Sequence, residues 1–126
     1  MMRLVIVLAC ALTVATSATA QGSQNTMSAG DLAGICSSSR DESKATCHAY
    51  ILGVTEGIQL GMSIADGKTN GGRPCIPQNL SGSALDIAVK TKLGADLMVY
   101  PADKALDASG VIGGILVATF PCQRTR

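Results

Sequence analysis

The chain has 126 residues, of which 47% are hydrophobic and only 2% aromatic, and its formal net charge is +1 from 10 basic and 9 acidic residues. This length fits one small domain. The weak charge and the lack of a basic tract argue against nucleic acids and anionic membranes as partners, because such surfaces recruit clustered lysines and arginines. We therefore expect another protein, or a second copy of the chain, as the partner.

Residues 1–20 have the plan of a secretory signal peptide. Arg3 gives a positive start, an apolar run follows, and an Ala-Thr-Ala tripeptide ending at Ala20 forms an A-x-A cleavage site. The apolar run is shorter than the roughly 20 residues that a transmembrane helix needs. Lipid attachment at Cys10 is disfavoured, because the apolar run continues through this residue. We expect cleavage after Ala20, a periplasmic mature protein and no integral membrane segment in it.

The remaining chain divides into a leader, a domain and a tail. Residues 21–28 are polar and without periodicity, which predicts a flexible leader. The folded domain is expected over residues 29–122. Residues 123–126 then form a C-terminal tail.

Two helices are expected in the first half of this domain. The Ser-Ala-Gly-Asp sequence at 28–31 resembles a capping box that opens a short helix ending near Cys36. A long helix should follow, because apolar residues recur with i, i+3, i+4 and i+7 spacing between Cys47 and Ala65. It should end where the glycines and prolines of residues 66–79 predict a loop.

The third helix is expected to begin near Ser81 or Ser83, because either serine can cap its first turn. It should end before Pro101, since the residue before a proline disfavours helical backbone. Its expected apolar face consists of Leu85, Ala88, Val89, Leu93 and Leu97.

The fourth helix should begin at Asp103 or Asp107 and end at Pro121. The β-branched run at 111–117 also fits a strand, but its glycines and the i, i+3, i+4 spacing of its apolar residues favour a helix. The predicted fold is therefore all-α, a small four-helix bundle-like domain stapled by two disulfides.

Removal of the signal peptide takes away Cys10 and leaves an even number of cysteines: Cys36, Cys47, Cys75 and Cys122. In an exported chain this predicts two disulfides, for which three pairings are possible. The pairs Cys36–Cys47 and Cys75–Cys122 are favoured, because antiparallel neighbouring helices bring the members of each pair together. The chain-entropy model gives roughly 3 and 4 kcal/mol for the two bridges.

The only histidine, His48, follows Cys47 directly, which suggests catalysis or metal binding at first sight. Adjacent helical residues point about 100° apart, so a Cys–His catalytic pair is disfavoured. Zinc-type spacings such as C-x₂₋₄-C and the haem motif C-x-x-C-H are absent from the sequence. We therefore expect a disulfide cysteine beside a surface histidine, with no catalytic residue, no metal ligand and no cofactor.

Small residues recur at every fourth position of the expected second helix: Ala49, Gly53, Gly57, Gly61 and Ala65. Glycine inside a helix costs about 0.5–1 kcal/mol relative to alanine, so this row predicts the close approach of another backbone. A neighbouring helix of the same chain is the favoured explanation. A dimer or partner interface, and mere tolerance of the glycines, remain open.

Three motifs, in their order and spacing, resemble those of the Rap/Tai family of bacterial immunity proteins. They are Cys-His-Ala-Tyr-Ile-Leu-Gly-Val at 47–54, Cys-Ile-Pro at 75–77 and Phe-Pro-Cys at 120–122. The resemblance covers about residues 29–122. It implies a small, exported, mostly helical protein of type VI secretion that binds and blocks a peptidoglycan amidase effector in the periplasm. Several members of the family are dimers, and none needs catalysis of its own for this inhibition.

The sequence departs from the family pattern in places that bear on binding. Ala49 stands where the family usually has glycine, and the segment 100–106 shares only its proline with the family. The effector-contacting surface lies in such variable parts, so contact residues have to be sought in exposed loops. The candidates are Lys68, Asn70 and Arg73 in the loop 66–79, and Tyr100 and Asp103 in the turn 100–107.

Two other functions fit the sequence less well than an inhibitory binding protein. A periplasmic acid-stress chaperone also uses a small disulfide-bonded helical domain, and nine carboxylates with one histidine would make this chain strongly positive at low pH. Suppression of client aggregation at low pH would favour that alternative. An enzyme is disfavoured, because the sequence offers one histidine and no nucleophile motif.

Overall fold

The computed structural model describes residues 26–65 and 72–122. Its elements are α1 (Ala29–Ser37), α2 (Asp41–Ile64), α3 (Gly82–Val99), the 3₁₀ helix η1 (Pro101–Ala105) and α4 (Ala108–Thr119). None of the described residues belongs to a strand, so the all-α prediction is confirmed and the alternative strand over 111–117 is wrong. None of these helices is long and apolar enough to cross a membrane.

Several sequence predictions lie outside the described residues. They are the signal peptide at 1–20, most of the leader, the C-terminal tail at 123–126, and the candidate binding residues Lys68 and Asn70.

Serine caps fix the starts of two helices. Ser28 Oγ accepts a hydrogen bond from Asp31 N at 3.1 Å and begins α1. Ser81 Oγ accepts a hydrogen bond from Ala84 N at 3.2 Å and begins α3. Ser81, and not Ser83, is therefore the N-cap of this helix. These bonds satisfy backbone N–H groups that have no partner inside the helix.

Between α3 and α4 the chain forms η1. Pro101 occupies its first position, and Asp103 N donates to Tyr100 O at 3.0 Å. Asp107 then caps α4, with its Oδ2 accepting from Gly110 N at 3.2 Å. Of the two predicted starts, Asp107 is therefore the N-cap of the last helix. Asp103 belongs to η1, because Pro101 starts a separate tight turn there.

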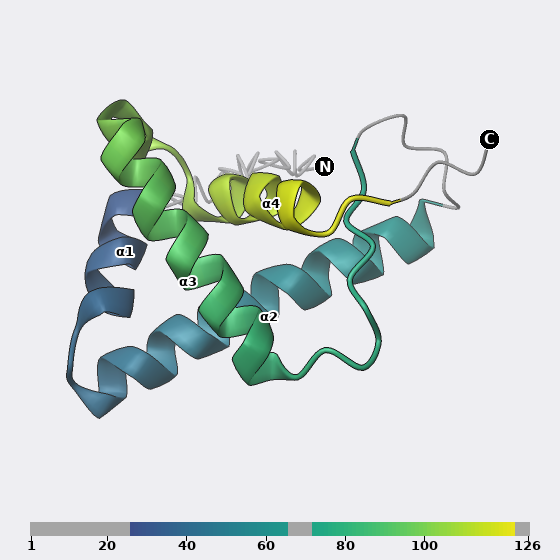
Figure 1. Cartoon of the computed structure of the whole chain (residues 1–126), viewed down its shortest axis with the longest axis horizontal. Helices are drawn as coiled ribbons and strands as arrows, with labels where there is room; N and C mark the ends of the chain where they lie inside the picture. Colours follow the sequence, from purple (N-terminus) through teal and green to yellow (C-terminus); the bar gives the residue numbers. More distant parts are fainter. Residues whose placement is uncertain (1–25, 66–71, 123–126) are drawn as a thin grey trace, which may run out of the picture.

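The helices cross rather than run side by side. In Figure 1, α3 crosses α2 at a steep angle, while α1 turns back on the start of α2 at one end of the molecule. The α4 helix packs on α2 where Ile58 Cδ1 lies 3.6 Å from the position of a Cβ on Gly113. This layout differs from the sequential antiparallel arrangement that the cysteine pairing suggested.

All four α-helices contribute to one hydrophobic core. Burial of a large aliphatic side chain stabilises the fold by roughly 1.5–3 kcal/mol. The largest fully buried side chains are Leu32, Ile51, Leu93, Ile112, Leu116, Val89 and Cys47. The core therefore consists mainly of aliphatic contacts, which matches a sequence almost without aromatic residues.

Two disulfides hold the ends of the helices. Cys36 and Cys47 join α1 to α2 with their Cα atoms 5.1 Å apart. Cys75 and Cys122 join the segment before α3 to the segment after α4, with a Cα–Cα distance of 4.8 Å. Cys75 N also donates to Phe120 O at 2.7 Å. This is the pairing that the sequence favours.

The ordered fold starts slightly before the expected domain. Ala108 N donates to Met27 O at 2.9 Å, and Ala29 N donates to Leu106 O at 2.8 Å. The sequence placed Met27 and Ser28 in the flexible leader. In the structure Met27 accepts the bond from Ala108, the first residue of α4, and Ser28 forms an isolated β-bridge with Asp107.

Candidate protein-binding surface

A groove of 560 Å³ lies where the end of α3, η1 and α4 meet, and we call it the η1 groove. Apolar side chains form its walls: Leu97 from α3, and Val111, Ile115 and Ala118 from α4. Tyr100 and Asp103, two of the predicted binding residues, both line it. The structure therefore brings together the candidates of the turn 100–107.

Two glycines of α4 keep the η1 groove open. Gly110 and Gly114 are four residues apart, on one side of the helix, and both line the groove. A Cβ added at either position would meet no atom of the described residues within 4 Å. In the sequence Gly114 served only as an argument against a strand and Gly110 did not stand out, because their role depends on α3 and η1 on the other side of the groove.

Large apolar side chains are exposed at its rim. Tyr100 is 61% exposed and Leu106 is 51% exposed, and both line the η1 groove. Met98 and Val99, in the last turn of α3, are exposed as well. Exposed apolar side chains grouped around a concave surface are typical of protein interaction sites.

Three carboxylates line the η1 groove, from Asp96, Asp103 and Asp107, and no described lining residue is basic. A hydrogen bond from the Ser109 hydroxyl, followed by one from the Gly110 backbone, lowers the pKa of Asp107 below its usual value. This carboxylate is therefore ionised at neutral pH. The sequence missed Asp96 in this site, because in sequence it is an ordinary helical residue before the turn.

The Asp107 carboxylate also acts on α2. Burial, and to a lesser extent the negative charge of Asp107, raise the pKa of Tyr50. The Tyr50 phenol therefore stays protonated at neutral pH. The negative charge of Asp107 therefore also acts on a side chain of α2.

The η1 segment is held tightly against α1. A Cβ on Gly30 would lie 3.1 Å from Lys104 Cβ and 3.2 Å from Lys104 O. Such distances are shorter than ordinary van der Waals contact, so glycine permits this close approach. Together with the backbone bonds of residues 27–29 to 106–108, it makes η1 a fixed part of the scaffold.

Arg73, the remaining described candidate, lies far from η1 in the fold. It is half-buried and lines a hollow of 620 Å³ between α2 and the segment before α3, together with Glu56 and Gln59. This segment is bonded to the residues after α4, whereas η1 precedes α4. Figure 1 shows the two segments at opposite ends of α4, so one compact site does not contain all the predicted binding residues.

The glycine row of α2 does not pack against another helix among the described residues. Gly53, Gly57 and Gly61 are exposed, and beyond their own stretch of helix no described atom lies within 4 Å of a Cβ added at any of them. Ala49 is exposed too, and Ala65 is half-buried. The favoured explanation, close intramolecular packing, is therefore wrong within the described part of the chain. A dimer interface on this row stays a prediction.

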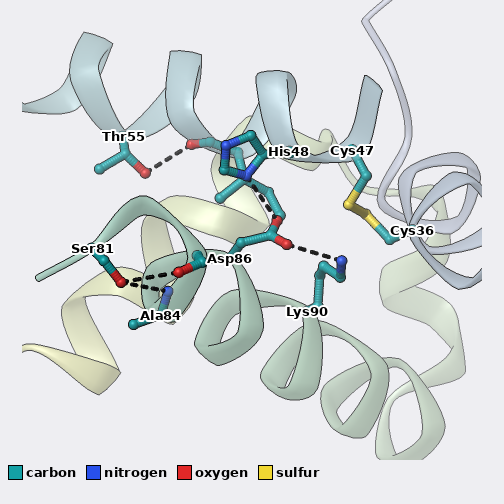
Figure 2. Close-up of polar contacts among 10 residues, drawn as sticks. Cys36, Cys47, His48, Thr55, Ser81, Ala84, Asp86 and Lys90 are labelled. Atoms are coloured by element: carbon teal, nitrogen blue, oxygen red, sulfur yellow. Dashed lines mark hydrogen bonds and ion pairs between the residues drawn. A yellow bond between two sulfur atoms is a disulfide. The ribbon is translucent and has the colours of Figure 1, made fainter. Parts of the chain in front are cut away.

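Cys47 and His48 point to different neighbours (Figure 2). Cys47 is fully buried in its disulfide and offers no thiolate. His48 Nδ1 lies 3.7 Å from Oδ1 of Asp86 in α3, whose other oxygen accepts from Lys90 Nζ at 2.9 Å. His48 is therefore part of a polar contact between α2 and α3, which the sequence did not predict. Among the described residues, no cluster of three potential metal ligands is present.

The comparison with protein families agrees with this architecture. The chain matches the family model of the Rap1a immunity proteins over residues 28–122. It belongs to this family. Searches of curated proteins and of solved structures gave no match.

The match to the Rap1a family includes every described helix and both disulfides. The matched range begins at the Ser28 cap of α1 and ends at Cys122 of the second disulfide. The Rap/Tai resemblance inferred from the three motifs is thereby confirmed. As a Rap1a immunity protein the chain has a protein effector as its expected partner, and its two disulfides are consistent with export.

Proposed function

We propose that this Rap1a protein acts in the periplasm, where it binds and blocks a peptidoglycan amidase effector of type VI secretion. The observation that carries the proposal is the family match over residues 28–122, which includes every described helix and both disulfides. An immunity protein protects the cell that makes it. An amidase that cuts the cell wall has to be inhibited in the compartment that contains the wall, which is the periplasm.

The N-terminus and the cysteines support export. Residues 1–20 have the features of a signal peptide, and disulfides persist in oxidising compartments such as the periplasm. Cleavage after Ala20 would leave Gln21 as the first residue of the mature protein.

A disulfide-fixed helical scaffold suits inhibition by contact. Binding loses affinity when side chains and loops have to be ordered, so a scaffold that is already rigid binds at a smaller entropic cost. The described η1 region is fixed by backbone hydrogen bonds from Ala29 N of α1 to Leu106 O and from Tyr100 N to Asp96 O of α3, and it presents exposed apolar side chains. A block of the effector's active site by such a surface requires no chemistry from the chain itself.

The experiment requires a cell-wall amidase as the effector, to be sought among the products of the neighbouring reading frames. The two proteins are co-expressed with the amidase directed to the periplasm, and cell lysis and peptidoglycan cleavage are measured. We expect the full-length chain to prevent lysis, and a variant without residues 1–20 to fail although it is produced in the cytoplasm. Purified mature chain should also abolish amidase activity at a stoichiometric ratio. Undiminished lysis and cleavage, with the chain present in the periplasm, would overturn the proposal.

A further inference from the structure

We propose that the η1 groove is the docking surface for the effector, and that it receives an effector segment in which a lysine or arginine lies beside aliphatic side chains. The inference rests on the proposed function and names the part of the partner that this surface fits. It follows from the shape, the apolar lining and the charge of the groove.

The shape of the η1 groove suits a protein segment. Its lining runs along α4 from Asp107 to Ala118, which is roughly 16 Å of helix axis. This length corresponds to about three turns of a helix or about five residues of an extended strand. Gly110 and Gly114 contribute no side chain to this path.

The apolar lining calls for aliphatic side chains of the partner. Val111, Ile115 and Leu97 form walls that an apolar side chain can contact, while Tyr100 and Leu106 stand exposed at the rim. Burial of this surface is favourable at about 25 cal/mol per Å² of apolar area. Tyrosine is among the residue types that most often carry binding energy at protein interfaces.

The charge of the groove calls for a cation of the partner. An effector segment that covers Asp96, Asp103 and Asp107 takes three carboxylates out of water, and no described lining residue is basic. An unpaired carboxylate is costly to desolvate, so the occupant has to supply positive charge. Lysine and arginine carry an aliphatic stem below the charged group, and thus fit an apolar wall with carboxylates at its rim.

Fixed geometry makes this charge pattern a stable feature. Asp107 is held by its capping bond to Gly110 N, and Asp103 lies in η1, which packs on Gly30 of α1. Little rearrangement is therefore needed when a partner binds. The glycine row of α2 lacks this combination, because none of its three glycines lines a described groove.

Two substitutions change the groove without touching the core. Gly114→Leu fills it, since an added side chain meets no described atom at the Cβ position. Asp103→Lys reverses one charge without removing a helix cap, because the cap of α4 is Asp107. The matched controls on α2 are Gly57→Leu, which adds the same side chain on an open face, and Glu56→Lys, which reverses a charge beside the other hollow.

Affinity for the inactivated neighbouring amidase is measured by calorimetry at about 50 mM and about 500 mM salt. We expect each groove variant to bind at least about tenfold more weakly, and both controls to stay within about threefold of the natural chain. The natural chain should lose affinity with rising salt, and Asp103→Lys should lose less. Circular dichroism and disulfide mapping check that all variants are folded.

The outcomes separate the two proposals. If the natural chain binds and blocks the amidase and the groove variants bind equally well, the docking inference is overturned while the proposed function stands. If Glu56→Lys alone weakens binding, the docking surface is the hollow near Arg73. If the natural chain does not bind, the proposed function fails.

A second probe tests the groove without the effector. A short amphipathic peptide of leucine and lysine is added to the isotope-labelled natural chain, with a leucine–glutamate peptide as the control. We expect the lysine peptide to shift the amide resonances of Gly110 and Gly114, and the glutamate peptide and the Gly114→Leu variant to show no such shift. Equal shifts with both peptides, or shifts confined to α2, would overturn the inference.

Discussion

The η1 end of the molecule and the middle of α2 are both rich in glycine, yet a side chain added in the two regions meets different surroundings. At Gly30 a Cβ would lie 3.1 Å from Lys104 Cβ, which shows a close approach of two segments. At Gly57 a Cβ would meet no described atom within 4 Å. The regular spacing of glycines is in α2, but the tight packing is at a glycine outside that row.

This difference shows that glycine spacing alone does not identify a packing face. A glycine in the sequence indicates only that a side chain is absent. The neighbouring elements of the fold determine whether the space beside the glycine is filled, forms a groove or is open to solvent. Gly30 is filled by η1, Gly110 and Gly114 leave a groove, and the α2 row faces open space in the described structure. The four predictions that follow test this contrast.

The largest expected effect comes from the disulfide at the end of α4 away from η1. Replacing both Cys75 and Cys122 with alanine opens a crosslink over 47 residues of sequence separation, which should lower the free energy of unfolding by about 4 kcal/mol. Urea unfolding measures this loss. Because neither of these cysteines lines the η1 groove, the affinity for the amidase should be retained at a temperature where the variant is folded. Loss of binding in a folded variant would show that the two ends are coupled.

Gly30→Ala should destabilise the protein although alanine is normally the better helix former. The added methyl group meets Lys104 Cβ and the Lys104 carbonyl oxygen, and such overpacking costs about 1–3 kcal/mol. The matched control is Gly34→Ala on the same helix, where the methyl group meets no described atom within 4 Å. Equal free energies of unfolding for the two variants would contradict the close approach of η1 to α1.

Gly57→Ala should stabilise the protein by about 0.5–1 kcal/mol, because alanine restricts the unfolded chain and fits an exposed helix position. Urea unfolding gives the difference, and light scattering of both proteins gives the mass in solution. A loss of stability at Gly57, or a shift from dimer to monomer, would instead show that the α2 row is an interface between two copies.

The smallest effect is expected at the cap of α4. The pKa of Asp107 is lowered by hydrogen bonds from Ser109 and Gly110, so the ionised carboxylate stabilises the fold above its usual pKa of 3.8. This contribution is lost as the pH falls through the lowered pKa of the folded state. Asp107→Asn keeps a capping side chain that does not titrate. The free energy of unfolding of the natural chain should therefore fall more steeply with acidification below pH 3.8 than that of Asp107→Asn; parallel curves would contradict this.

Local signals in the sequence predicted much of the fold. The caps at Ser28 and Ser81 and the proline at the start of η1 act on the neighbouring turns of the chain. The favoured cysteine pairing follows from which helix ends can come together. The steep crossing of α3 over α2 could not be predicted, because crossing angles depend on how side chains of both helices interlock.

The candidate site was only partly accessible from the sequence. Tyr100 and Asp103 stood out because they lie in a turn next to a proline, and both line the η1 groove. Asp96 and Gly114 did not stand out, since each belongs to a separate helix and acquires its role only when α3 and α4 meet. The contact of His48 with Asp86 has the same origin, because it joins residues of two helices that cross.

Hydrogen–deuterium exchange of the natural chain, alone and with the inactivated amidase, shows directly where the effector docks. We expect binding to slow amide exchange in the segment from Asp96 to Gly114, around the η1 groove, and to leave the glycine row of α2 unchanged. Protection confined to α2 or to the segment around Arg73, with none around η1, would show that the effector docks elsewhere.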